Sequence, residues 1–173
     1  TDVTITDELV HAIARSVIAG TDRILADPAD YGARASMMWS ATLALNGLQT
    51  LGYGGISFAN HAIEHSLSAL YDIAHGAGLA IVMPAWFKYH LQKDGPARLE
   101  KFGAAVFGVK TAEGTIKAFE DWFRKIGAPT RLSKAGIPVA DIPKIAGNAM
   151  GLIKQWGMDY DQKTVEEILN KAV

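Results

Sequence analysis

Hydrophobic positions recur at helical spacing over most of this chain. Leu9 and Ile13 share one face of a first segment that begins with Thr6 as its N-cap and reaches Gly20. The same periodicity predicts further helices over residues 29–48, 58–71, 76–90, 96–107, 111–126, 139–155 and 161–172. No convincing run alternates apolar and polar residues as a half-buried strand does. The pattern therefore predicts a single all-α domain of seven or eight helices over residues 1–173.

Glycine-rich and proline-rich passages separate the predicted helices. Residues 52–55 form a flexible break, and residues 127–129 end the helix before them. Pro84 is expected to bend the helix that starts near Gly76. The residues Met37, Met38 and Trp39 lie on an apolar helical stripe and are expected in the core.

Composition narrows the class of protein. The 173 residues suffice for one domain with a substantial core, and 49% apolar with 20% charged residues is ordinary for a globular protein. With a net charge of −1, the chain has no excess of positive charge that would attract nucleic acid or an anionic membrane. The absence of cysteine excludes thiolate metal sites and fits a reducing compartment, and no apolar run approaches the ~20 residues of a membrane span. The composition predicts a cytoplasmic protein without nucleic-acid or membrane partners.

Three of the five histidines lie within fifteen residues, at His61, His65 and His75. His61 and His65 are four residues apart and share a helical face. His61 and His75 are fourteen residues apart, which on one straight helix is ~21 Å, too far to share a metal ion. They converge only if the chain reverses near Tyr71, in which case Asp72 is placed to cap the next helix or to hold the His75 ring.

Two alternatives explain the same residues without such a shared site. The run from His61 to His65 matches His-x-x-Glu-His, the pattern of inverted zinc metallopeptidases, in which both histidines bind zinc and the glutamate, here Glu64, is the general base. That pattern fixes only three residues and leaves His75 unexplained. In the other alternative, the histidines are surface or core residues of a non-catalytic helical scaffold.

The run over residues 61–86 resembles the iron-dependent, or group III, alcohol dehydrogenases, and most closely their butanol-dehydrogenase-like branch. Residues 31–47 and 126–137 fit the same branch, so the resemblance covers most of the chain. It implies the dehydroquinate-synthase-like helical C-terminal domain of a two-domain enzyme. The N-terminal α/β domain, which binds NAD or NADP, is absent from this chain. The start at Thr1, without methionine, also suggests a piece of a longer polypeptide.

The resemblance also implies roles for the three histidines. Family members hold a divalent metal with one aspartate and three histidines, and His61 and His75 correspond to the last two histidine ligands. His65 corresponds to a non-ligand histidine beside the substrate, placed to relay the alcohol proton. The metal, iron in the first place and zinc as an option, acts as a Lewis acid on the oxygen of a small alcohol or aldehyde. The choice between NAD and NADP, the particular alcohol and the oligomeric state stay open, with a homodimer as one option.

The chain departs from the family pattern at two places. The remaining ligands stand in the family as Asp-x-x-x-His, and Asp7 and His11 have this spacing. Their surroundings resemble a later family helix that carries no ligand, so we expect the missing ligands before Thr1 and an inactive isolated chain. Residues 57–60, where Ser57, Phe58 and Asn60 replace the usual Asp, Trp and Thr, affect the expected substrate preference more than metal binding.

Overall fold

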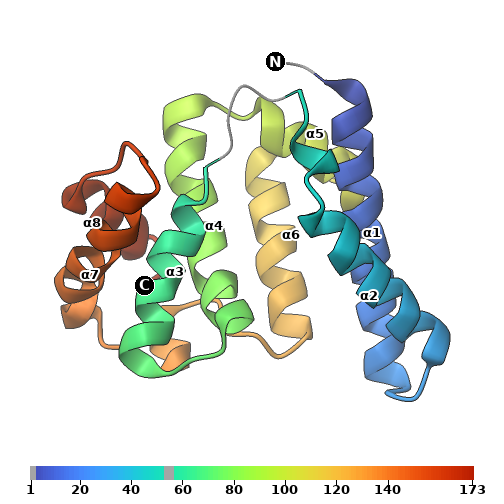
Figure 1. The fold of residues 1–173 in the computed structure, drawn as a ribbon, viewed down its shortest axis with the longest axis horizontal. Helices are drawn as coiled ribbons and strands as arrows, with labels where there is room; N and C mark the ends of the chain where they lie inside the picture. Colours follow the sequence, from blue (N-terminus) through green and yellow to red (C-terminus); the bar gives the residue numbers. More distant parts are fainter. Residues whose placement is uncertain (1–2, 53–56) are drawn as a thin grey trace. The chain divides into compact units, whose positions relative to one another are not determined.

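The computed structural model describes residues 3–52 and 57–173, and the regular structure within these ranges is helical (Figure 1). Eight α-helices follow one another: α1 (Thr4–Ala26), α2 (Tyr31–Leu45), α3 (Ala59–Tyr71), α4 (His75–Asp94), α5 (Ala97–Val106), α6 (Ala112–Lys125), α7 (Ile142–Gln155) and α8 (Gln162–Asn170). Three short 3-10 helices lie between them: η1 (Leu48–Thr50), η2 (Leu132–Ala135) and η3 (Val139–Asp141). The all-α prediction and the expected number of helices are confirmed.

The first helix differs from its prediction at both ends. It begins at Thr4 with Val3 as the N-cap, so Thr6 lies inside the helix and donates its hydroxyl to the Leu51 carbonyl at 2.9 Å. It also continues past Gly20 to Ala26. A glycine inside a helix costs only about 1 kcal/mol relative to alanine, which favourable flanking residues offset.

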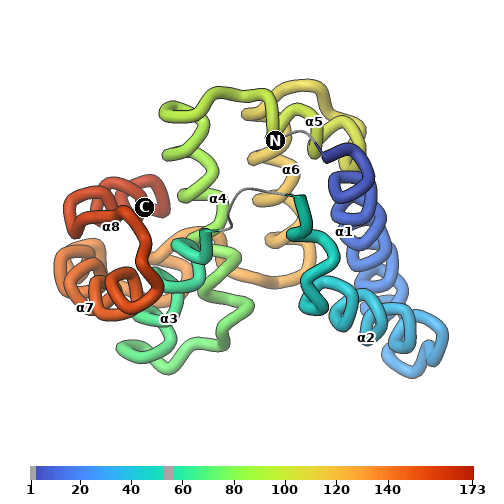
Figure 2. The backbone as a smooth tube through the Cα atoms, turned by 45° about the horizontal axis from the view of Figure 1, so that its top comes forward, coloured from blue at the N-terminus to red at the C-terminus, as the bar shows by residue number. Residues whose placement is uncertain are grey.

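The chain divides into two compact units, residues 1–56 with 104–108 and residues 57–103 with 109–173. In the first unit, α1 and α2 pack as an antiparallel hairpin (Figure 2). Asp30 caps α2 by accepting from the Ala33 backbone N–H at 2.9 Å, and the Arg23 guanidinium donates to the same carboxylate. The prediction that residues 1–173 form one domain stays a prediction.

The second unit contains the hydrophobic core. Its helices pack α3 on α4 and α7, α4 on α6 and α8, and α7 on α8. The fully buried aliphatic side chains of this core include Ile63, Leu67, Ile81, Val82, Leu132, Ile145, Ile153, Val165, Ile168 and Leu169. The helices that carry the histidine run, α3 and α4, are therefore held by the best-packed part of the chain.

Several smaller expectations have separate outcomes. Met38 and Trp39 are 74% and 63% exposed, so their predicted place in the core is wrong in this structure. The helix through Pro84 runs on to Asp94, four residues beyond its predicted end. The predicted break at residues 52–55 lies, apart from Gly52, outside the described residues. Within the described ranges, the helices are too short or too polar to cross a bilayer.

Candidate metal centre

The corner between α3 and α4 brings the histidines together. α3 ends at Tyr71, and Asp72 follows in the left-handed conformation with φ 53°. The Ser68 hydroxyl lies 3.0 Å from the Ile73 carbonyl oxygen across the turn and shares its one proton between that oxygen and Glu64, and α4 then starts at His75. The predicted reversal of the chain near Tyr71 is therefore confirmed.

His61 and His75 face each other across this corner. The Nδ1 atom of His61 lies 3.2 Å from the Nε2 atom of His75, and the ring centroids are 5.3 Å apart. Two ring nitrogens bound to one tetrahedral ion at 2.0–2.1 Å lie about 3.3–3.4 Å apart. The separation of these two nitrogens thus fits a shared divalent metal.

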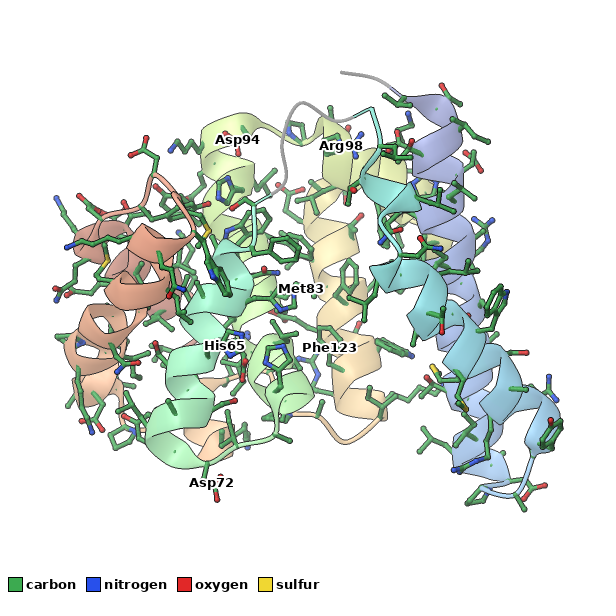
Figure 3. All side chains as sticks on the ribbon, in the orientation of Figure 1. His65, Asp72, Met83, Asp94, Arg98 and Phe123 are labelled. Carbon is green, nitrogen blue, oxygen red and sulfur yellow. The ribbon has the colours of Figure 1, made fainter. Side chains whose placement is uncertain are left out.

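His65 lies on the other side of the His75 ring. The two rings stack with their centroids 5.1 Å apart and their planes 24° from parallel. His65 is exposed and projects from α3 toward the start of α4 (Figure 3). An exposed imidazole at this place is able to exchange protons with a bound molecule or with water.

Glu64 supports the His75 ring from inside the core. Its side chain is fully buried, its Oε2 atom bonds the His75 Nδ1 atom, and its Oε1 atom accepts from the Ser68 hydroxyl at 2.6 Å. Gly78 makes room for it, because a Cβ at position 78 would lie 2.7 Å from the Glu64 Cγ atom. A carboxylate on one imidazole nitrogen fixes the tautomer and aims the other nitrogen at a metal.

Asp72 has neither of the roles expected for it. It is exposed at the end of α3, and its side chain points away from the histidines (Figure 3). Ala74 is the N-cap of α4, without a side-chain hydrogen bond. The left-handed backbone at Asp72 reverses the chain, so that His75 faces His61 while the Asp72 side chain points away from both.

Sequence reasoning missed the role of Glu64 toward His75. The two residues are eleven positions apart and lie on different helices, so no local spacing rule joins them. The one local signal was Gly78, a small residue on the buried face of α4, which indicates a close neighbour without naming it.

A second ligand set is geometrically available in the same cluster. Ligating atoms of Glu64, His65 and His75 all lie within 4.8 Å of one another. Glu64, however, already accepts from Ser68 and bonds His75, and its full burial separates it from a bound substrate. We therefore favour His61 with His75 as the ligand pair.

The surroundings of His61 favour its neutral form. Burial lowers the pKa of His61, the nearby His75 and His65 lower it further, and only the Glu64 carboxylate acts in the opposite direction. Neutral imidazole is the form that binds a metal ion. The neutral ring of His61 is thus available as a ligand.

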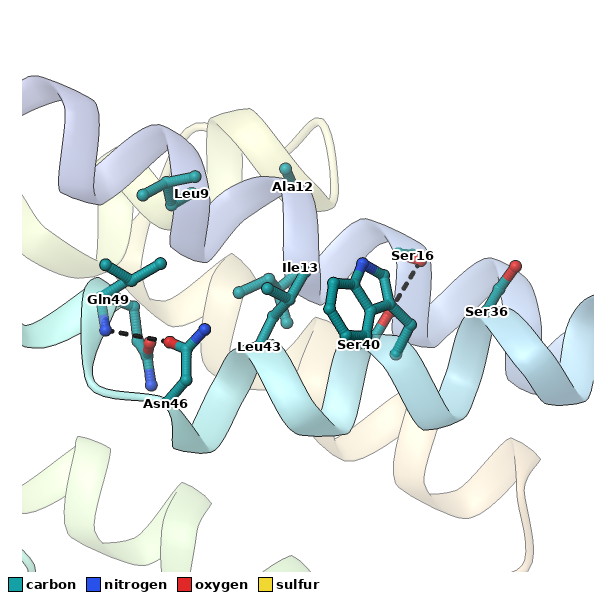
Figure 4. Close-up of a pocket in the computed structure, with 11 residues that line it drawn as sticks. Leu9, Ala12, Ile13, Ser16, Ser36, Ser40, Leu43, Asn46 and Gln49 are labelled. Carbon is teal, nitrogen blue, oxygen red and sulfur yellow. Dashed lines mark hydrogen bonds between the residues drawn. The ribbon is translucent and has the colours of Figure 1, made fainter.

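Asp7 and His11 lie apart from this cluster along the chain. Both are buried on α1, in the first unit, whereas the three clustered histidines belong to the second. The first unit also contains a cavity of about 310 Å³ between α1 and α2 (Figure 4). Its wall carries apolar, hydroxyl and amide groups, with Leu9, Trp39, Ser40 and Asn46 among its residues, and no acid, base or histidine lines it. This cavity therefore lacks the groups for acid–base or metal chemistry.

Comparison with known proteins identifies the class to which this fold and corner belong. The model of the Fe-containing alcohol dehydrogenase family, C-terminal, matches residues 2–173. The chain belongs to this family, of which it represents the C-terminal helical part. The family resemblance read from residues 61–86 is thereby confirmed.

Three relatives show how specific the match is. The chain is 38% identical to NADH-dependent butanol dehydrogenase B of Clostridium acetobutylicum, over 76% of this chain and 35% of that protein. It is 32% identical to the NADPH-dependent aldehyde reductase YqhD of Escherichia coli, over 83% of this chain and 38% of that protein. The crystal structure of NADH-dependent butanol dehydrogenase A from Thermotoga maritima superposes with a TM-score of 0.93 at 43% identity, over 100% of this chain and 47% of that one. The chain spans between about a third and a half of the length of these relatives.

The peptidase alternative finds no support. An inverted metallopeptidase needs a glutamate that reaches a water molecule at the metal. Glu64 is fully buried and its two oxygens are engaged by His75 and Ser68. The relatives that the chain matches are named as a butanol dehydrogenase and an aldehyde reductase, which are oxidoreductases.

Proposed function

We propose that this chain is the metal-binding part of an NAD(P)-dependent alcohol dehydrogenase or aldehyde reductase. The observation that carries the proposal is the 3.2 Å approach of the His61 and His75 ring nitrogens, with Glu64 behind His75. The family match and the names of the relatives support the same reaction class. The nicotinamide cofactor would bind a preceding N-terminal domain, as the partial coverage of the relatives suggests.

Each residue of the cluster has its own task in this proposal. His61 and His75 hold the divalent metal, and Glu64 keeps the His75 ring in the ligating tautomer. The metal, when bound, polarises the oxygen of the alcohol or aldehyde as a Lewis acid. His65, exposed and stacked on His75, moves the proton between the substrate hydroxyl and solvent.

The metal and the substrate follow from the same comparison. Imidazole ligands serve both iron and zinc, and the family description favours iron. The relatives act on butanol and on aldehydes, which favours a small alcohol or aldehyde as substrate. Two imidazoles alone bind a divalent ion weakly, so we expect the isolated chain to be inactive and the complete protein to supply further ligands.

Substitution of the histidines in the full-length gene product tests this function. We expect His61→Ala and His75→Ala to lose most of the bound metal, measured by elemental analysis. Their kcat/KM for butanal with NAD(P)H should fall at least about 100-fold, because several kcal/mol of Lewis-acid stabilisation disappear. His65→Ala should retain the metal and lose about 10²–10⁴-fold in kcat, with an altered pH profile.

Two outcomes would contradict the assignment. Full metal content and activity in both His61→Ala and His75→Ala would make the helical region a scaffold without a metal role. Loss of metal in His65→Ala, with metal retained in His61→Ala, would instead favour the set formed by Glu64, His65 and His75.

A further inference from the structure

Two exposed aromatic side chains border the histidine cluster. Phe58 and Trp156 are 47% and 42% exposed, although large apolar side chains in the second unit are mostly buried or half-buried. The Phe58 ring meets His61 edge to face with centroids 5.5 Å apart, and the Trp156 ring meets His65 in the same way at 5.9 Å. The two aromatic rings also contact each other, with centroids 6.5 Å apart at 76°. We call this pair the aromatic wall.

The polypeptide around the aromatic wall is tied down at several points. Trp156 is the C-cap residue of α7, and Gly157, at φ 66°, turns the chain toward α8. The Tyr160 hydroxyl, a few residues on, accepts from the Trp86 indole N–H at 3.2 Å and bonds the His90 Nε2 atom at 2.6 Å. The segment that carries Trp156 is thus anchored to α4 at Tyr160.

The segment that carries Phe58 is also held in place by a contact. The Ser57 hydroxyl donates to the Met158 sulfur at 3.8 Å, which joins the start of α3 to the segment after α7. Phe58 directly follows Ser57, and Trp156 lies two residues before Met158, so this contact joins the two segments that carry the aromatic residues. His90 is half-buried and belongs to this anchor. Exposed rings on an anchored backbone make a fixed apolar surface.

We propose that the aromatic wall binds the apolar substituent of the substrate and sets its preferred chain length. The inference rests on the proposed function, which holds the reacting oxygen at His61 and His75. The alkyl or aryl group on the reacting carbon then extends from beside the His61 and His75 rings. Phe58, in contact with His61, and Trp156, in contact with His65, lie next to this place. The wall offers ring faces and edges and, apart from the indole N–H, no hydrogen-bonding group, so it favours alkyl or aromatic aldehydes over polyhydroxylated ones.

Chain-length dependence in the full-length, metal-loaded protein tests the proposal. kcat/KM is measured for ethanal, butanal and hexanal at saturating NAD(P)H. Each methylene buried against the wall raises kcat/KM by up to about fourfold, and we expect about two- to fourfold per methylene in the wild type. Trp156→Ala should reduce this factor below about 1.5 by removing the apolar surface, while Trp156→Phe, which keeps a ring, should retain most of it.

A matched control separates the wall from general apolar exposure. Val139 is 44% exposed in the same unit and lies on η3, so Val139→Ala should leave both kcat/KM and the factor per methylene unchanged. Metal content and far-ultraviolet circular dichroism equal to wild type show that a variant is folded. An unchanged factor per methylene in Trp156→Ala would overturn the proposal. A roughly tenfold higher KM for NAD(P)H in Trp156→Ala, with an unchanged factor in kcat/KM per methylene, would also overturn it. The wall would then bind the nicotinamide and not the substrate.

A binding measurement distinguishes this proposal from the proposed function. Calorimetric titration compares 1-hexanol with ethanol on the metal-loaded wild type and on Trp156→Ala. Suppose that the wild type shows no turnover but binds hexanol, and that Trp156→Ala does not bind it. This result refutes the dehydrogenase function and supports the apolar wall. Hexanol affinity that is the same in both proteins, or undetectable in the wild type, overturns the wall.

Discussion

The two compact units have the same secondary structure and very different interiors. Among the described residues, the buried hydrophobic side chains lie in the second unit, with Ala33 as the one exception. In the first unit, the buried side chains besides Ala33 are polar or absent, at Thr6, Asp7, His11, Gly20 and Ser40. An apolar helical stripe therefore predicts a helix in both units but predicts burial correctly only in the second.

This difference explains where a precise site is able to form. Imidazole nitrogens that share an ion must be held within about 0.5 Å, which requires neighbours locked by packing. Ile63 and Leu67 on α3 and Ile81 and Val82 on α4 are fully buried, and they hold the two helices that carry the histidines. The α1–α2 hairpin of the first unit lacks such an interior, and its cavity is lined by apolar, hydroxyl and amide groups.

Truncation of one large side chain in each unit gives the largest expected contrast. Ile145 is fully buried on α7, so Ile145→Ala should lower the free energy of unfolding by about 2–5 kcal/mol through lost burial and a cavity. Leu45 is 88% exposed at the end of α2, and Leu45→Ala should change it by less than about 0.5 kcal/mol. Urea unfolding followed by circular dichroism measures both. Equal effects would mean that the two interiors do not differ as described.

A pair of buried helical glycines should respond with opposite signs. A Cβ at Gly78 would collide with Glu64, so Gly78→Ala should destabilise the second unit by about 1–3 kcal/mol. At Gly20 the nearest atoms would lie 3.7 Å from a Cβ, an ordinary contact. Gly20→Ala should therefore stabilise the first unit by about 0.5–1 kcal/mol through helix propensity. Melting temperatures of the two variants decide, and stabilisation by Gly78→Ala would refute the close packing around Glu64.

Glu64 on α3 and Asp72 at the C-cap of α3 are two carboxylates of the second unit that should differ in their effect on metal affinity. Glu64→Gln removes the charge behind His75 and should weaken metal affinity about 10–100-fold. Asp72→Asn is the matched control, because Asp72 is exposed and asparagine tolerates its left-handed backbone. It should leave metal affinity unchanged. Competition with a chromophoric chelator measures the dissociation constants of the full-length variants, and equal constants in both would exclude the supporting role of Glu64.

The sequence determined the helices and the corner between α3 and α4. Helical periodicity depends on neighbours within one or two turns, so the predicted ranges agree with the observed helices to within a few residues in most cases. The reversal near Tyr71 followed from requiring His61 and His75 to converge. The family resemblance assigned their roles, which stay predictions until the substitutions are made.

Tertiary structure alone decided which groups meet across helices. The bond between Glu64 and His75 and the contact of Trp156 with His65 each join residues on different elements. The outward direction of the Asp72 side chain was also visible only in the structure. The exposure of Trp39 was likewise decided by tertiary structure and not by its apolar helical stripe. Such contacts depend on how helices pack, and packing is set by the combined shape of many side chains, which spacing along the chain does not contain.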